Sequence, residues 1–182
     1  SGALIVPDDS KNNSIISYQH GTITDPKHAP SFFSETASNG FAAVMASLGF
    51  NVSLPDYLGY GESANFHHPY EHGESLASAS YDMLLASREF ILSNELGLGD
   101  KLFLTGYSEG GYATMALHQY TENKGDLTVT ASAPAAGAYN KSELALDIIS
   151  SDEPLPFIPY YLWVLDTYNW VYGINKPWSY YL

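Results

Sequence analysis

Residues 101–115 read KLFLTGYSEGGYATM, and this stretch decides the fold that the sequence predicts. The short apolar run at 101–105 is typical of a buried strand, and the helix-forming residues at 109–120 follow it almost at once. Between the two stands GYSEG, a Gly-x-Ser-x-Gly pattern centred on Ser108. The spacing therefore predicts a strand, a sharp turn at the serine and a helix, which is the context that this pattern requires.

A nucleophilic role for Ser108 would explain the glycines around it. A serine held on a sharp strand-to-helix turn has a strained backbone, and side chains two residues to either side would collide. Placing the serine at the start of a helix also brings backbone N–H groups and the positive end of the helix dipole close to a developing oxyanion. The alternative is a tight turn in which Ser108 only caps the helix. The flanking strand and helix favour the nucleophile.

A second loop supports this interpretation. The sequence YQHGT at 18–22 follows an apolar run earlier in the chain, where a donor for an oxyanion hole is needed. We expect the two donors to be the backbone N–H groups of Glu109, the residue after the serine, and of Thr22. For the side chain of His20 we predict a turn histidine that hydrogen-bonds its own loop.

The rest of the chain alternates short apolar runs with helical patterns. The runs GALIVP and SIISYQHG, at 2–7 and 14–21, indicate two strands that together resemble a hairpin. Further strands are predicted at 50–55 and within 127–139, which brings the number to five. Single strands that alternate with helices imply crossover connections, so we predict an α/β fold with a mostly parallel sheet flanked by helices.

Two helices are predicted between these strands. In the first, over 34–49, an apolar stripe is formed by Phe41, Val44, Met45 and Leu48. The second and longest covers 74–96, and its stripe contains Leu76, Met83, Leu84, Phe90 and Ile91.

The pattern changes after residue 140. Residues 157–182 hold ten aromatic side chains without strand-helix alternation. We therefore expect a core over 1–140 and the start of a cap or lid insertion over 141–182. The aromatic residues could line a binding pocket, pack the inside of the cap, or do both.

Composition excludes several classes of function. The 7 Lys and Arg against 20 Asp and Glu give a formal charge of −13, so a nucleic-acid partner is not expected. The chain has no cysteine, which rules out disulfides and thiolate chemistry. No apolar run approaches the roughly 20 residues of a membrane helix, and no membrane span is expected. The loop histidines His67, His68 and His72 lack a zinc-binding pattern and are predicted to be solvated, with no metal and no cofactor.

Three segments together resemble a known family. SYQHGT, LPDYLGYGES and GYSEGG, in that order, are similar to the α/β-hydrolase superfamily and, within it, to secreted serine lipases and esterases; the likeness covers roughly 1–140. It implies hydrolysis of a small-molecule carboxylic ester through an acyl-enzyme on Ser108, a cap over the pocket, and secretion or export to the periplasm. GYSEGGYAT also resembles the serine aminopeptidase and oligopeptidase branch of the superfamily. A non-catalytic fragment is the third reading.

The resemblance also implies an acid and a histidine after the nucleophile. Only His118 follows Ser108, and ten residues of straight helix would place it about 15 Å along the axis, too far for a base. Asp56 precedes the serine and is predicted to tie the glycine loop by local hydrogen bonds. The later aspartates, Asp126, Asp147, Asp152 and Asp166, come before the point where the family places its acid. Five strands are also fewer than the roughly eight of a complete core. We therefore expect the acid and the base outside this chain, on a second polypeptide segment that completes the fold.

Overall fold

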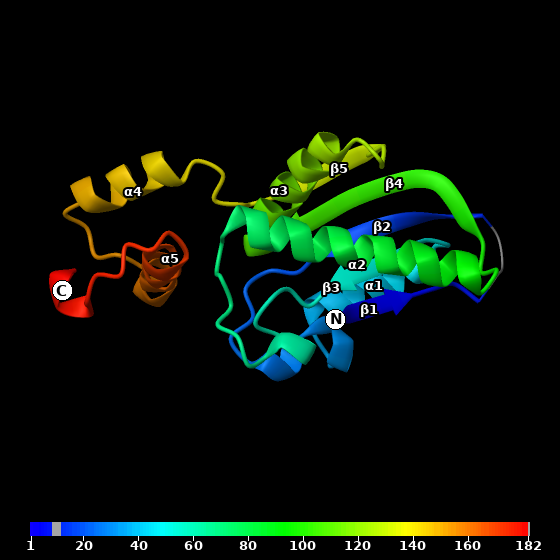
Figure 1. The fold of residues 1–182 in the computed structure, drawn as a ribbon, viewed down its shortest axis with the longest axis horizontal. Coiled ribbons are helices and arrows are strands. Elements are labelled where there is room, and N and C mark those ends of the chain that lie inside the picture. Colours follow the sequence, from blue (N-terminus) through cyan, green and yellow to red (C-terminus); the bar gives the residue numbers. More distant parts are fainter. Residues whose placement is uncertain (9–11, 182) are drawn as a thin grey trace.

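The centre of the structure, a computed structural model that describes residues 1–8 and 12–181, is a five-stranded sheet (Figure 1). Its strands are β1 (Gly2–Ile5), β2 (Asn13–Gln19), β3 (Asn51–Pro55), β4 (Leu98–Tyr107) and β5 (Ala131–Ala135). They are ordered β1-β3-β2-β4-β5; β1 is antiparallel to β3, and every other neighbouring pair is parallel. The predicted α/β fold with a mostly parallel sheet is confirmed.

Helices flank this sheet and continue beyond it. The α-helices are α1 (Ala37–Ser47), α2 (Gly73–Ser93), α3 (Glu109–Lys124), α4 (Lys141–Ser150) and α5 (Ile158–Val171). Short 3-10 helices are η1 (Pro26–His28), η2 (Pro30–Phe32), η3 (Gly61–Ser63) and η4 (Trp178–Tyr180). None of the helices in the described part of the chain combines the length and the apolar character that crossing a bilayer requires.

Adjacent residues of one strand serve opposite faces of the sheet. Ile15 packs with Leu102 and Leu104 in the cluster under α2 and α3, whereas Ile16 packs with Val52 in the cluster under α1. Side chains alternate between the two faces along a strand, so a run that is apolar at every position can supply both layers. This is why the strands appear in the sequence as short continuous apolar runs.

The predicted hairpin of the first two strands is wrong. β1 pairs with β3, with Ala3 opposite Leu54, and β2 lies on the other side of β3. The apolar pattern of a strand does not identify its neighbour in the sheet. The neighbour depends on where the chain re-enters the sheet after a later crossover connection, and here β3 enters between β1 and β2.

The predicted helix stripes are only partly correct. In α1 the buried positions include Ala42 and Ala46, while Val44 and Leu48 are more than half exposed. In α2 the stripe is buried at Leu76, Leu84 and Ile91, but Phe90 is 54% exposed. The small side chains of Ala42 and Ala46 let α1 pack close to the sheet. The larger side chains of Val44 and Leu48 lie on the solvent side.

The sheet order creates a crevice between the ends of β2 and β4. From β2 the chain passes through α1 to β3 on one side, and from β4 it passes through α3 to β5 on the other. In parallel sheets ligands bind where the connections diverge in this way, at the carboxyl ends of the strands. Gln19 lies opposite Gly106 in the register, so the loop at 20–22 and the turn at Ser108 leave the sheet side by side.

Residues after 140 contain helices, and no strand is found among those that the structure describes. Figure 1 shows α4 and α5 beyond the end of the sheet from which α3 begins. They contact the core through a few side chains: Lys141 pairs with Glu71, and Trp163 stacks on Tyr70 at 4.5 Å. The predicted division into a core and a cap at residue 141 stays a prediction.

Candidate functional site

Ser108 occupies the strained turn between β4 and α3. Its backbone has φ 58° and ψ −124°, a region that residues with a side chain seldom adopt. The turn is held by its own N–H, which donates to the Ala135 carbonyl at 2.9 Å, and by Tyr112 N–H, which donates to the Ser108 carbonyl at 3.1 Å. Within the described residues the Ser108 hydroxyl has no hydrogen-bond partner.

The glycines around the serine are required by close backbone contacts. A Cβ on Gly106 would lie 2.5 Å from the Gln19 carbonyl oxygen, and one on Gly110 would overlap the same atom. A Cβ on Gly111 would run into the carbonyl of Ala135. The predicted collision on both sides of the serine is confirmed, because the end of β2 lies directly against this turn.

Ser108 lines a cavity of about 700 Å³ together with the predicted oxyanion loop. Gly21 and Thr22 form part of the wall, and a Cβ on Gly21 would be 3.7 Å from the Ser108 Cβ. The segment after residue 140 adds Phe157, Tyr160 and Tyr161 to the lining. The structure therefore brings Ser108 and Thr22 into one cavity, with Glu109 next in the chain.

Three tyrosines from the segment after β3 support the predicted oxyanion loop. Tyr57 donates its hydroxyl to the His20 carbonyl at 3.0 Å, and Tyr60 donates to the Ile23 carbonyl at 2.6 Å. The hydroxyl of Tyr70 lies 2.9 Å from that of Thr22. Sequence reasoning did not assign these roles, although Tyr57 and Tyr60 lie within LPDYLGYGES.

Burial keeps these phenols neutral. It raises the pKa of Tyr57 well above the ordinary value of 10, and the charge of Glu109 raises it further. Burial and the same carboxylate also raise the pKa values of Tyr60 and Tyr70. The three hydroxyls therefore stay protonated across the physiological range. Those of Tyr57 and Tyr60 donate to carbonyl oxygens, and between Tyr70 and Thr22 either hydroxyl can be the donor.

His20 lies under the oxyanion loop and is 1% exposed. Its Nδ1 is 2.7 Å from the Gly21 carbonyl, as predicted for a histidine that bonds its own loop, and its Nε2 is 3.1 Å from the Asp56 carbonyl. The ring also packs against Tyr57, with centroids 4.1 Å apart. Burial lowers its pKa from 6.5. His20 therefore supports the loop from below.

Asp56 connects segments that are far apart in sequence. Its carboxylate accepts a hydrogen bond from Ser31 N–H at 2.8 Å and one from the Ser1 hydroxyl at 2.6 Å. The Ser1 hydroxyl in turn accepts from Glu62 N–H in the glycine loop at 3.0 Å. The prediction of local bonds to that loop is wrong, because the link runs through Ser1.

The side chain of Glu109 is fully buried and contacts His68. Their Oε1 and Nε2 atoms are 2.7 Å apart, and His68 is 7% exposed. The prediction that His68 belongs to a solvated loop is therefore wrong. His72 instead lies 3.1 Å from the Ser75 hydroxyl, so the neighbouring loop histidines do not converge. Among the described residues no group of three His, Cys, Asp or Glu is arranged to hold a metal ion.

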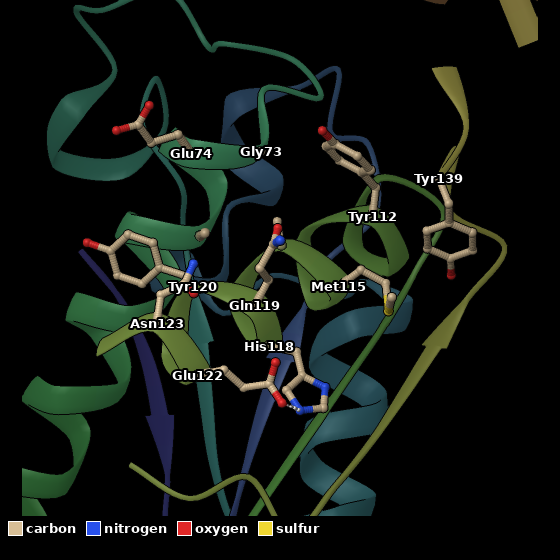
Figure 2. A pocket seen from close by; sticks show the side chains of 12 residues that line it. Gly73, Glu74, Tyr112, Met115, His118, Gln119, Tyr120, Glu122, Asn123 and Tyr139 are labelled. Carbon is tan, nitrogen blue, oxygen red and sulfur yellow. Dashed lines mark ion pairs between the residues drawn. The ribbon is translucent and has the colours of Figure 1, made fainter. Parts of the chain in front are cut away.

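No imidazole bonds to the Ser108 hydroxyl in the described part of the chain. His118 lies 2.9 Å from the Ser132 hydroxyl and 3.7 Å from Glu122. Figure 2 shows His118 beside Glu122 in a separate cavity of about 890 Å³, whose lining does not include Ser108. His28 lines the cavity of Ser108, and sequence reasoning did not consider it.

Comparison with known proteins gives structural matches alone. No family model matches the chain, and no curated protein matches it. A hydrolase candidate from Legionella pneumophila matches with a TM-score of 0.77 and 34% identity over 87% of this chain and 43% of that one. The rice cell wall degrading esterase LipA from Xanthomonas oryzae, in a ligand-bound form, matches with a TM-score of 0.71 and 30% identity. This match covers 79% of this chain and 39% of the esterase.

A third match concerns the fold alone. Candida antarctica lipase A has a TM-score of 0.66 with 15% identity over 91% of this chain and 39% of the lipase. The chain thus spans about two-fifths of the length of these solved structures. With its mostly parallel sheet flanked by helices, the chain has a partial α/β-hydrolase fold and resembles the lipases and esterases of that superfamily.

Proposed function

We propose that this chain carries the nucleophile of a serine hydrolase that cleaves small-molecule carboxylic esters. One observation carries the proposal: the Ser108 hydroxyl stands without a partner on a strained turn, in a cavity shared with the Gly21–Thr22 loop. The likeness to the esterase LipA supports an ester as the substrate.

In the proposed reaction the Ser108 oxygen attacks the acyl carbon and its proton passes to a general base. The N–H groups of Glu109 and Thr22 would stabilise the negative charge on the former carbonyl oxygen. The bond to the alcohol oxygen then breaks, and the alcohol leaves with the proton. Water adds to the acyl-enzyme, the acid is released, and the serine is regenerated.

The base and the acid that orients it are proposed to come from a second polypeptide segment outside residues 1–182. Two observations support this. No imidazole of the described residues bonds to the Ser108 hydroxyl, and the matched structures are more than twice as long as the part that this chain covers. Secretion or export to the periplasm stays a prediction from the resemblance.

Ser108→Ala in the full-length protein tests the nucleophile. Turnover of a p-nitrophenyl ester should fall at least about a thousand-fold, because the acyl-enzyme cannot form. A fluorophosphonate probe should label Ser108 in the wild type. His118→Ala is the matched control and should retain turnover, since His118 lies in the other cavity. An unlabelled wild type would mean that the chain is non-catalytic.

Two further measurements test the remaining assignments. His28→Ala should not abolish turnover; a loss as large as that of Ser108→Ala would identify His28 as the base and contradict a base from elsewhere. Acyl esters should also show a larger kcat/KM than peptide anilides, and the reverse order would make the enzyme a peptidase.

A further inference from the structure

A buried carboxylate lies immediately behind the proposed oxyanion hole. The Glu109 side chain is 0% exposed, although its backbone N–H belongs to the residue after the nucleophile. Its Oε1 contacts His68 Nε2 at 2.7 Å, and within the described residues its Oε2 has no hydrogen-bond partner. An unpaired charge is strongly disfavoured in such a place, so the contact with His68 decides the charge state of this part of the turn.

The second nitrogen of His68 is also held. Its Nδ1 lies 2.7 Å from the Leu58 carbonyl oxygen, which can only accept a hydrogen bond, so Nδ1 carries a proton and donates it. The other proton is shared along the short contact between Nε2 and the Glu109 carboxylate. Whichever of the two atoms holds that proton, the pair as a whole is neutral.

We propose that His68 is a positioning residue that acts through Glu109, neutralising the buried carboxylate so that the turn can stabilise an oxyanion at Ser108. The inference rests on the proposed function. An anion forms on the substrate next to the N–H of Glu109, and a bare carboxylate on the same residue would oppose it at short range and low dielectric. With His68 in place, the N–H dipole acts without that opposing charge.

The groups around the pair do not offer another counter-charge. The titratable and charged groups that face it are His20, Tyr57, Tyr60, Tyr70 and Glu71, with Lys141 behind Glu71. The tyrosine hydroxyls are neutral, and burial lowers the pKa of His20. The Lys141 ammonium is already bound to Glu71 at 2.5 Å. Among the described residues, His68 is therefore the group that can offset Glu109.

His68 is also enclosed by aromatic rings, which keep water from screening the pair. The ring centroid of Tyr60 lies 4.7 Å away, and Trp163 of α5 presents an edge-on contact at 5.6 Å. Screening by water is what makes an exposed carboxylate harmless to a neighbouring anion. Because this carboxylate is fully buried, bulk water does not screen it, and neutralisation must come from the protein.

The test uses four variants of the full-length protein: His68→Gln, Glu109→Gln, the double variant, and His67→Gln as a matched control. His67 is the neighbouring histidine and is exposed. His68→Gln should lower kcat about ten- to a hundred-fold with KM changed little, because the opposition acts on the oxyanion and not on bound substrate. Rates are expressed per active site titrated with a fluorophosphonate, so that misfolded protein does not count.

Two results separate an electrostatic role from a packing role. The loss in His68→Gln should grow as pH rises, since the unpaired carboxylate is then ionised more fully. Adding Glu109→Gln should restore most of the lost kcat, because it removes the charge that His68 had offset. His67→Gln should match the wild type throughout.

Other outcomes overturn the inference. Equal losses in His68→Gln and in the double variant, or a loss that does not vary with pH, would leave His68 with a packing role only. If His68→Gln does not fold, the double variant decides, and it must fold and turn over ester within about ten-fold of wild type. A wild type that neither labels at Ser108 nor cleaves esters fails at the earlier step and refutes the proposed function itself.

Discussion

Single residues around Ser108 are constrained by backbone atoms of other segments. Gly110 lies in the first turn of α3, and the space of its missing Cβ is taken by the carbonyl oxygens of Gln19 and His20, at the end of β2. Gly111 stands in the same relation to Ala135 at the end of β5. The helix can therefore start close to both strands only because these positions lack side chains.

Gly110→Ala should destabilise the protein and reduce labelling of Ser108. The added methyl group would push α3 away from β2, and overpacking of this kind costs about 1–3 kcal/mol. Gly40→Ala is the control, because no atom lies within 4 Å of a Cβ at Gly40 in α1. Alanine there should stabilise by about 0.5–1 kcal/mol. Urea unfolding measures the stability change of both variants. Equal changes of the same sign would contradict the claim that close backbone contacts require a glycine at position 110.

Among the elements, the segment that follows β3 has the largest part in building the site. Tyr57, Tyr60 and Tyr70 support the oxyanion loop, and His68 contacts Glu109. The same segment reaches the cap, where Glu71 binds Lys141, the first residue of α4. One connection thus links the strand edge, the turn at the serine and the aromatic helices.

Lys141→Gln should loosen the cap without unfolding the core. The Lys141 ammonium also lies 3.6 Å from the ring centroid of Tyr112, so its removal loses an ion pair and a cation–π contact. A charged hydrogen bond contributes about 1.5–3 kcal/mol, which corresponds to at least about ten-fold faster amide exchange in α4 and α5. Lys176→Gln, at an exposed lysine, is the control. Unchanged exchange in Lys141→Gln would show that other contacts hold the cap.

For the whole molecule, the sheet order places the site. β2 and β4 are neighbours in space although α1, β3 and α2 lie between them in the chain. Their carboxyl ends carry the loop with Thr22 and the turn with Ser108, and Phe157 and Tyr160 from the segment after residue 140 line the same cavity. The site thus combines residues from the beginning, the middle and the end of the chain.

Acidification should destabilise the whole fold below about pH 6.5 through His20. Burial lowers its pKa in the folded state, whereas in the unfolded chain it titrates near 6.5. Below that pH the unfolded chain binds a proton that the folded one does not, so the free energy of unfolding falls by up to about 1.4 kcal/mol per pH unit. Above pH 6.5 the contribution is complete. His72 acts in the same direction, since burial lowers its pKa too.

Urea unfolding from pH 7.5 to 5.5 measures this dependence. His20→Asn should flatten the slope, even if it lowers stability at every pH. If the slope is unchanged in His20→Asn, His20 is not the cause of the pH dependence of stability.

Predictions from the sequence succeeded where neighbouring residues decide the outcome. The turn at Ser108 was predictable because glycines two residues to either side and a strand-helix boundary are visible in one short stretch. The helix after the serine begins at Glu109 as expected and ends only four residues later than predicted, at Lys124. The α/β class followed from the alternation of strands and helices. The oxyanion donors and the role of Ser108 stay predictions.

The sequence by itself determined the local conformations, the five strands and the glycine-bounded turn, because these depend on residues close together in the chain. Only the tertiary structure decided that β1 joins β3, that Val44 and Phe90 face outward, and that His68 is buried against Glu109. The last contact spans 41 positions, with α2 and β4 between its partners in the chain. Its partners carry no local signal, since a histidine beside a proline in a polar loop has the same pattern whether it meets water or a carboxylate. Which of the two it meets depends on the strand order, which brings that loop over the start of α3.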